Sequence, residues 1–441
     1  MNWRKPLIFA GLRFTGSKIP AYLKESERIE KLSPEEIQRY QDEKLRQVLL
    51  HAYNNVPYYH RVLPEVGAIR NGNVDLEKFA KIPVLTKDII REEGESLYSA
   101  DYRKRKSYHN TSGGSTGEPV RFIQDNQYWQ MNIANKLYFN ILLGKDVGEK
   151  EINLWGSERD IFKNTLSIKE RVTNFLYNRT FLNAYRMDED RLKGFVTTIN
   201  RTKPVSMWVY VESIDLLAKF IEANGLKVYS PECIITTAGT LFPEIRERVE
   251  AVFQCPVYNQ YGSREVGPVA VECKHKQGLH CFPWSQKPEL IGEGEFKDII
   301  VTDLTNYSMP LIRYETGDIG EGVGSEICKC GRPTLTFKDI KGRITDLFVD
   351  KKGTAIYGAY FRHALFEIDW VKKYQIVQKD YDHILYRIVK SGDIREGDLE
   401  KITDTVKTIM GGDCKVEFEF VDEIEPSKSG KYLYTISEIN R

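Results

Sequence analysis

The sequence lacks an excess of charge of either sign. Its 64 lysine and arginine residues nearly balance 63 aspartate and glutamate residues, so the formal net charge is only +1 at pH 7. Proteins that bind nucleic acids or other acidic polymers usually present an electrostatic field of one sign. The composition therefore argues against a nucleic-acid partner and favours small molecules as partners.

Long apolar runs are also missing. No stretch approaches the roughly 18 consecutive apolar residues that a membrane-spanning helix needs, so the sequence predicts no membrane span. The apolar N-terminal segment PLIFAGLRF is interrupted by Arg13, and no clear small-residue cleavage site follows it. We expect a surface helix or arm there, rather than a secretory signal or a peripheral membrane-binding segment.

Cysteine is scarce as well. The seven cysteines in 441 residues do not form a regular paired framework. A chain of this length can bury a core without disulfides, and such proteins are common in reducing compartments. We therefore expect a reducing, cytoplasmic environment.

The residues that are present show an α/β pattern. Ser33, Pro34 and Glu36 form a helix-start signature, with Ser33 as N-cap and Glu36 completing a capping box. After this start, apolar residues recur at helical spacing: Leu45, Val48, Leu49 and Ala52. In the middle of the chain, short apolar runs such as EINLW, CIITTAG and DIIVTDL alternate with longer amphipathic stretches. This alternation is typical of a layered α/β domain.

The pattern changes near GRITD, residues 342–346. Residues 381–389 (YDHILYRIV) have the composition of a strand, and residues 414–421 (CKVEFEFV) alternate with a period of two. Between them, one helix face collects apolar residues: Leu399, Ile402, Val406 and Ile409. We therefore expect an α/β protein with a large multi-layer N-terminal domain, residues 1–342, and a small α+β C-terminal domain, residues 343–441.

The segment HNTSGGSTGEPVRF, residues 109–122, is a candidate phosphate-binding loop. Glycine lets backbone N–H groups approach a bound phosphate, and the interspersed hydroxyls add donors. The segment lacks the Gly-Lys-Ser/Thr ending of a P-loop, so a neutralising lysine must come from elsewhere. Taken alone, the segment is also compatible with a plain turn.

Further segments place polar or glycine-rich tips after apolar runs: TTAGTLFP (236–243), NQYGSREVG (259–267), RYETGDIG (313–320) and EPSKSGKYLYTIS (425–437). In this order, together with the loop above and GRITD, they resemble the adenylate-forming superfamily of acyl-CoA ligases. NNVPYYHRVL (54–63) is similar to the N-terminal signature of the branch that contains phenylacetate–CoA ligases and capsule-biosynthesis adenylating proteins. The resemblance spans most of the chain, and six motifs in the family's order are a specific signal.

The resemblance implies a nucleotide site. Ala238 and Gly239 would pass along the adenine of ATP, Tyr261 would lie near the base or the acyl group, and Glu265 would bind Mg²⁺, a hard cation that prefers oxygen ligands. Read without the family, Glu265 is an ordinary loop acid. The β- and γ-phosphates would be held by Thr111, Ser112, Gly113, Gly114, Ser115, Thr116 and Gly117.

The resemblance also assigns roles to three charged residues. Asp318 would accept hydrogen bonds from the ribose hydroxyls from within a Thr-Gly turn, and Arg343 would assist at the ribose or phosphates. Lys431 is similar to the family's adenylation lysine, which a mobile C-terminal domain carries into the site. Without the family, Asp318 reads as a turn residue and Lys431 as a solvated lysine. The family's acidic hinge position holds Thr345 here and Asp346 follows, so the sequence leaves the hinge residue open.

A second cluster suggests a structural Zn²⁺ site. VECKHKQGLHCFPW and EICKCGRP supply two groups of soft ligands of the kind that close a zinc tetrahedron. By resemblance to branch members we expect the ligand set Cys273, His280, Cys328 and Cys330. Sets that use His275 or Cys281, and reduced cysteines without metal, are the alternatives.

The expected activity is that of an AMP-forming ligase. A substrate carboxylate would attack the α-phosphorus of Mg-ATP to give an acyl-adenylate, and the acyl group would then pass to coenzyme A. The alternative is an adenylating ligase of capsular or surface polysaccharide biosynthesis, which transfers the acyl group to an amine, a sugar or a carrier protein in trans. A non-enzymatic alternative, a degenerate member that only binds nucleotide, conflicts with the presence of Glu265, Asp318 and Lys431. The sequence identifies neither the acid nor the oligomeric state.

Overall fold

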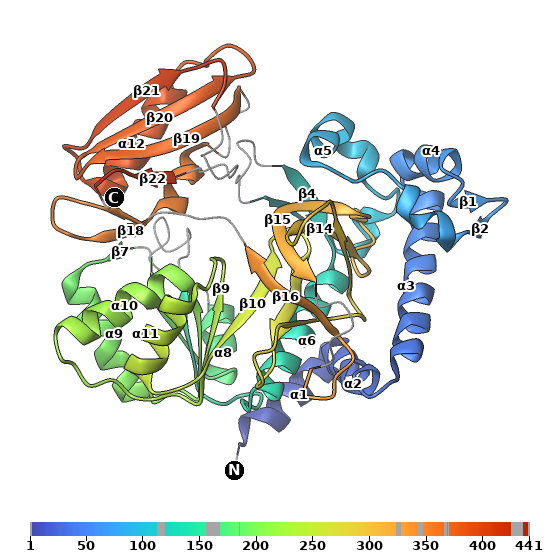
Figure 1. The fold of residues 1–441 in the computed structure, drawn as a ribbon, viewed down its shortest axis with the longest axis horizontal. Coiled ribbons are helices and arrows are strands. Elements are labelled where there is room, and N and C mark those ends of the chain that lie inside the picture. The colour runs from blue at the N-terminus through green and yellow to red at the C-terminus, as the bar shows by residue number, and fades with distance from the viewer. Residues whose placement is uncertain are drawn as a thin grey trace. The chain divides into compact units, whose positions relative to one another are not determined.

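The structure, a computed structural model, describes residues 2–112, 120–155, 168–184, 186–322, 328–341, 347–365, 368, 370–424 and 435–439 (Figure 1). Its described residues fall into two compact units. The first takes in those of residues 1–112, 120–149 and 258–342, and the second those of residues 150–257 and 343–441. We describe each unit by itself. Division of the chain into domains at residue 342 stays a prediction.

Helices of the first unit come mainly from the N-terminal part of the chain. In α3, Ser33 Oγ accepts a hydrogen bond from Glu36 N and the Glu36 carboxylate accepts one from Ser33 N, so the predicted capping box is present. The predicted apolar face of α3 is buried, from Leu45 to Ala52. The helices are α1 (Arg4–Phe14), α2 (Ile19–Ile29), α3 (Pro34–Asn55), α4 (Pro57–Glu65), α5 (Lys87–Glu93) and α6 (Asn126–Leu142), with short 3₁₀ turns at Leu76–Lys81, Gly94–Leu97 and Tyr102–Arg105.

The first unit also contains an antiparallel sheet, in the order β13-β14-β15-β16-β12-β11-β10. Its large apolar core joins this sheet to α3, α4 and the β3–β4 hairpin. The strands are β10 (Val257–Ser263), β11 (Gly267–Glu272), β12 (Leu279–Cys281), β13 (Gln286–Ile291), β14 (Lys297–Asp303), β15 (Tyr314–Gly322) and β16 (Leu335–Lys341), with hairpins β1 (Ile69–Arg70) and β2 (Asn73–Val74), and β3 (Tyr108–Thr111) and β4 (Arg121–Gln124).

The second unit begins with a parallel sheet in the order β9-β8-β5-β6. The predicted runs EINLW and CIITTAG form β5 and β9, and the nearly continuous burial of both fits parallel strands that helices cover. The elements are β5 (Glu151–Trp155), α8 (Ile168–Leu176), β6 (Arg179–Asn183), β7 (Arg186–Met187), α9 (Glu189–Thr202), β8 (Ser206–Tyr210), α10 (Val211–Ala223), β9 (Cys233–Thr237) and α11 (Pro243–Phe253).

The C-terminal part of the second unit has its own α+β core. Ile402, Val406 and Ile409 of α12 are buried with residues of β19 and β20, which confirms the predicted helix face. On β21, Val416 and Phe418 pack partly against this core, whereas Phe420 is 40% exposed. The elements are β17 (Leu347–Val349), β18 (Ala355–Tyr357), a 3₁₀ segment (Gly358–Leu365), β19 (Val371–Asp380), β20 (His383–Lys390), α12 (Asp398–Met410), β21 (Lys415–Phe420) and β22 (Thr435–Ser437), with sheet order β21-β20-β19-β22.

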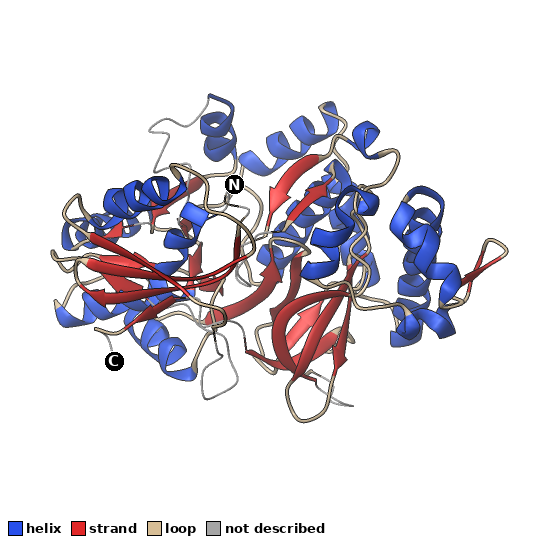
Figure 2. Cartoon of the chain, turned by 90° about the horizontal axis from the view of Figure 1, so that it is seen from above, coloured by secondary structure: helices blue, strands red, loops and turns tan. Residues whose placement is uncertain are grey.

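The mixture of helices and strands in Figure 2 confirms the α/β class with a small α+β C-terminal part. The predicted N-terminal surface helix is also present as α1. Among the described residues, every helix is too short or too polar to cross a bilayer.

Candidate functional site and metal centre

Glu265, the predicted magnesium ligand, lies in the turn of a β-hairpin. The strands β10 and β11 pair down to Ser263 and Gly267, so residues 264–266 make the turn. Glu265 is only 7% exposed, and its Oε1 accepts a hydrogen bond from the Tyr314 hydroxyl at 3.4 Å. A buried carboxylate with an anionic oxygen is the type of donor that Mg²⁺ prefers.

The turn that carries Glu265 is attached to the start of the predicted phosphate loop. Arg264 Nη1 donates to the backbone oxygen of Thr111 at 3.3 Å. Ser112, the last described residue before the loop, is buried and bonded to Val120 through its backbone N (2.9 Å) and its Oγ (2.9 Å). These contacts join the two ends of the loop at Ser112 and Val120 and place Thr111 beside the turn that holds Glu265.

Gln124 on β4 holds these two segments together, and sequence reasoning missed it. Its buried side-chain amide donates to the backbone oxygens of Arg264 (2.8 Å) and Glu265 (3.0 Å) and accepts from Asn110 Nδ2 (3.0 Å). The only feature of the sequence that marks Gln124 is its place as a polar residue at the end of the strand that follows the glycine-rich loop. We regard Gln124 as a positioning residue.

Asp318 lies in a bulge within β15, which corrects the predicted Thr-Gly turn. Glu315 pairs with Ile300 and Ile319 pairs with Asp298, so three residues, 316–318, stand opposite one residue of β14. Gly317, at φ +76°, allows this conformation because glycine has no Cβ.

The bulge fixes the carboxylate of Asp318. The hydroxyl of Tyr261 lies 3.0 Å from Asp318 Oδ2 and 3.2 Å from Thr316 Oγ1, and Thr316 Oγ1 in turn donates to Ile299 O. Tyr261 is buried with its ring edge-to-face on Phe337. The predicted place of Tyr261 beside the base or acyl group stays a prediction.

In the second unit, Ala238 and Gly239 follow β9. Ala238 has a positive φ of 65°, and a Cβ on Gly239 would lie 2.3 Å from Oε1 of Glu212 on α10. Burial raises the pKa of Glu212 to about 7. Its Oε2 has no hydrogen-bond partner among the described residues. Sequence reasoning missed Glu212, although it stands in WVYVES, directly after a buried strand.

The remaining predicted nucleotide-site residues lie outside the described residues: Gly113, Gly114, Ser115, Thr116, Gly117, Arg343, Thr345, Asp346 and Lys431. Their roles stay predictions.

The predicted metal ligands come together in the first unit. One ligand atom of each residue lies within 4.8 Å of all the others: Cys273, His280, Cys328 and Cys330. The Cys273 and Cys328 sulfurs are 3.5 Å apart, and Cys330 Sγ is 3.5 Å from His280 Nε2. Tetrahedral zinc with Zn–S of about 2.3 Å and Zn–N of about 2.0 Å requires an S···S distance of about 3.8 Å and an S···N distance of about 3.5 Å. The donor set and these two distances fit Zn²⁺.

Two similar turns present the thiols. In the first, Lys276 N donates to Cys273 O and His275 N to Cys273 Sγ. In the second, Gly331 N donates to Cys328 O and Cys330 N to Cys328 Sγ. Burial raises the pKa of the Cys273 thiol, and the N–H donor that points at its sulfur acts in the opposite direction, toward the thiolate form that binds metal.

The surroundings of His280 favour its neutral form, which is the form that binds a metal ion. Its Nδ1 lies 3.1 Å from Thr334 Oγ1, which leaves Nε2 facing Cys330, and burial lowers the pKa of His280 to about 4. Cys281, the next residue on β12, points to the other face, with its Sγ 3.9 Å from Gln286 O. The alternative ligand sets with Cys281 or His275 do not form a cluster among the described residues.

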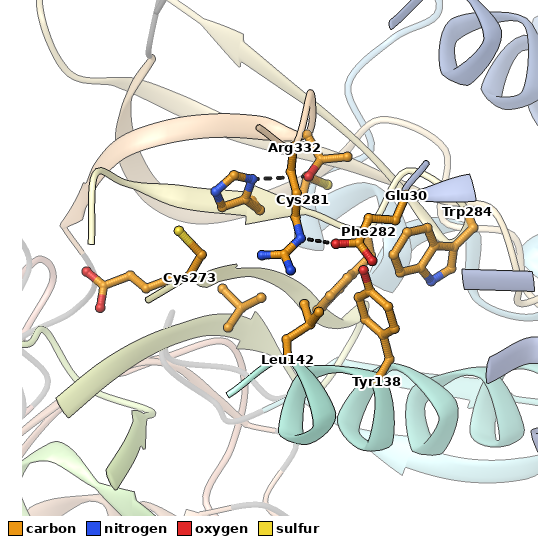
Figure 3. Close-up of a pocket in the computed structure, with 12 residues that line it drawn as sticks. Glu30, Tyr138, Leu142, Cys273, Cys281, Phe282, Trp284 and Arg332 are labelled. Carbon is orange, nitrogen blue, oxygen red and sulfur yellow. Dashed lines mark hydrogen bonds and ion pairs between the residues drawn. The ribbon is translucent and has the colours of Figure 1, made fainter. Parts of the chain in front are cut away.

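A pocket lies beside this cluster and is lined mostly by apolar groups (Figure 3). Cys273 stands at one side of it, and the guanidinium of Arg332 points to the carboxylate of Glu30 in an ion pair. Arg332 lies two residues after Cys330, so this ion pair fixes the second cysteine turn to α2.

The chain is similar to known proteins both in sequence and in structure. A family model described as the CapK C-terminal domain matches residues 348–438. Protein CapK of Staphylococcus aureus is 25% identical over 99% of this chain and 95% of its own length. Phenylacetate-coenzyme A ligase of Thermus thermophilus is 25% identical over 79% of this chain and 80% of its own length.

Among solved structures, the chain is similar to 2-hydroxyisobutyryl-CoA ligase in complex with 2-HIB-AMP and CoA. The TM-score is 0.62, the identity is 19%, and the match covers 94% of this chain and 92% of the other. At this identity the likeness shows a shared fold.

Proposed function

Since the chain belongs to the adenylate-forming superfamily, in its phenylacetate–CoA ligase-like branch, we propose that it activates a carboxylic acid as an acyl-adenylate and then transfers the acyl group to coenzyme A. At family level it is an AMP-forming ligase. The identity of the acid and of the acceptor belongs to the proposal.

The observation that carries the proposal is the attachment of the Glu265 turn to the base of the loop at Thr111. A phosphate-binding loop and a magnesium ligand must be adjacent, because the metal bridges phosphate oxygens that the loop holds. Gln124 and Arg264 provide this adjacency through three hydrogen bonds to main-chain oxygens.

In the adenylation step, the residues of this chain bind and orient the two substrates. Asp318, held by Tyr261, accepts hydrogen bonds from the ribose hydroxyls of ATP. Glu265 would hold Mg²⁺, which neutralises phosphate charge when bound. Lys431 would stabilise the charge that develops as the substrate carboxylate attacks the α-phosphorus and pyrophosphate leaves.

We also propose that the four-residue cluster holds a structural Zn²⁺, with Cys273, His280, Cys328 and Cys330 as ligands. All four coordination positions are then occupied by protein, so the ion would supply folding stability and no open position for a substrate.

One observation favours the alternative acceptor. The match to Protein CapK runs through nearly the whole chain and includes the C-terminal model, whereas the match to the phenylacetate–CoA ligase of Thermus thermophilus covers 79% of the chain. If the small domain helps to admit the acceptor, transfer to an amine, sugar or carrier in place of coenzyme A becomes the second candidate.

The test is a screen of carboxylic acids for AMP release, with and without coenzyme A. We expect AMP release with one class of acid, and a thioester product when coenzyme A is present. Acid-dependent AMP release that coenzyme A does not accelerate, with no consumption of coenzyme A, would select the second candidate. Absence of both AMP release and acid-dependent pyrophosphate exchange with every acid, from protein that binds ATP, would contradict adenylation.

The variant Glu265→Gln checks the magnesium assignment. A neutral amide is a poor ligand for a hard dication, so adenylation should require much more Mg²⁺ while the fold stays intact. Glu272→Gln is a matched control, since Glu272 is also buried in this hairpin but accepts from Asn259 N at 2.7 Å. If Glu265→Gln required no more Mg²⁺ than the wild-type protein, the assignment of Glu265 as the magnesium ligand would be wrong.

A further inference from the structure

Helix α1 exposes an apolar stripe. Trp3, directly before the helix, is 48% exposed, Leu7 is 53% exposed and Phe14 is 94% exposed, with the exposed Ala10 between them. Their spacing of four, three and four residues keeps all four within an arc of about 60° at 100° per residue. Large exposed apolar side chains aligned in this way usually mark an interaction surface.

The opposite face of α1 is fixed to the first unit. Ile8 is buried, Lys5 forms an ion pair with Asp146 at 2.9 Å, and Asn2 Nδ2 donates to Val147 O at 2.7 Å. Gly148 lets the helix approach closely, since a Cβ there would lie 2.7 Å from Arg4 Cβ. The stripe therefore points away from the body to which α1 is attached.

The segment that carries the stripe is basic in its sequence. The first acidic residue of the chain is Glu25, and five basic residues precede it: Arg4, Lys5, Arg13, Lys18 and Lys24. Asp146 balances the charge of Lys5. The guanidinium of Arg4 lies 4.5 Å from the ring centroid of Trp3.

Although the sequence alone favours a surface helix without a membrane role, the exposed stripe changes this interpretation, and we propose that α1 docks this protein reversibly on an anionic lipid surface. Apolar side chains next to basic ones, with a tryptophan at the edge, suit a helix that lies in the interface of a bilayer. The positive charge of residues 1–24 complements anionic head groups. A second copy of the chain fits less well, because pairing two such segments would bring like charges together. The docking does not depend on which acid or acceptor the enzyme uses.

The experiment is co-sedimentation of the full chain with vesicles of phosphatidylcholine, with and without phosphatidylglycerol. We expect binding to the anionic vesicles that decreases as salt is added, and at least about tenfold weaker binding of Leu7→Glu/Phe14→Glu. The charge variant Arg13→Glu/Lys18→Glu should lose binding to a similar degree. Val172→Glu is the matched control, since Val172 on α8 is 52% exposed and should leave binding unchanged.

Thermal unfolding and sedimentation velocity complete the test. All variants should unfold at the wild-type temperature, because the altered side chains are exposed. The proposal is overturned if the wild-type chain does not sediment with anionic vesicles, if neutral vesicles bind it equally well, or if Val172→Glu loses as much binding. It is also overturned if the wild-type chain is a dimer that Leu7→Glu/Phe14→Glu converts to a monomer.

Discussion

Replacement of Gln124 by leucine should lower both the stability of the protein and its affinity for Mg-ATP. The change removes two hydrogen bonds, to Arg264 O at 2.8 Å and Glu265 O at 3.0 Å, and the acceptor for Asn110 Nδ2. Each lost hydrogen bond costs about 1 kcal/mol, and buried groups without a partner cost more. We expect the free energy of unfolding to fall by about 2–4 kcal/mol.

The same change should weaken binding of Mg-ATP. Glu265 keeps its side chain in Gln124→Leu, but its turn loses two of the three hydrogen bonds that hold it beside the base of the loop. We expect roughly tenfold weaker binding, about 1.4 kcal/mol, measured by titration calorimetry with and without Mg²⁺. ATP binding without Mg²⁺ should change less.

Gln41→Leu is the control for this experiment. The Gln41 side chain on α3 also donates to two main-chain oxygens, those of Pro283 (3.4 Å) and Gln286 (2.9 Å). It should lose stability and keep its affinity for Mg-ATP. If both variants weakened Mg-ATP binding equally, or if Gln124→Leu lost stability but kept full affinity, the positioning role of Gln124 would be refuted.

Three further predictions concern other parts of the chain. Cys328→Ser should contain no zinc by elemental analysis and should unfold at a lower temperature than the wild-type protein, whereas Cys414→Ser should keep its zinc. Wild-type protein that contains no zinc would contradict this prediction. Lys431→Ala should slow adenylate formation on the order of 10²-fold and leave acyl transfer from a supplied acyl-adenylate near the wild-type rate. If both reactions slowed equally, Lys431 would not act specifically in adenylate formation. Since the pKa of Glu212 is raised to about 7 by burial, wild-type stability should decrease from about pH 4.5 to pH 7, where the folded state binds the extra proton. Glu212→Gln cannot ionise, so it should remove this dependence and be about 3 kcal/mol more stable than the wild-type protein at pH 8, because each unit by which the folded and unfolded pKa values differ is worth about 1.4 kcal/mol. Denaturation of both proteins at pH 5 and pH 8 checks this.

Several elements were predictable because their signals are local. The capping box at Ser33, the buried strand EINLW and the helix face from Ile402 to Ile409 each depend on neighbouring residues and on one periodicity. The bulge at Asp318 was not predictable as such. A Thr-Gly-Asp sequence is compatible with a turn, and only the pairing of β15 with β14 shows that the strand continues beyond it.

A residue of the candidate site could be predicted from the sequence only where it belongs to a family motif. YGSRE and YETGD pointed to Glu265 and Asp318, whose roles stay predictions. Gln124 and Glu212 have no motif, and their importance comes from partners distant in the chain, such as the Glu265 main chain, 141 residues from Gln124.

The sequence by itself determined which residue types were available for metal binding and roughly where each strand and helix would form, because composition and periodicity are properties of the chain alone. The tertiary structure decided which of these metal-binding residues lie close together. Antiparallel pairing of β12 with both β11 and β16 brings His280 beside two cysteine turns that are 55 residues apart, and the alternation along β12 turns Cys281 to the other face. Strand register decides this choice, and register depends on contacts across the whole sheet.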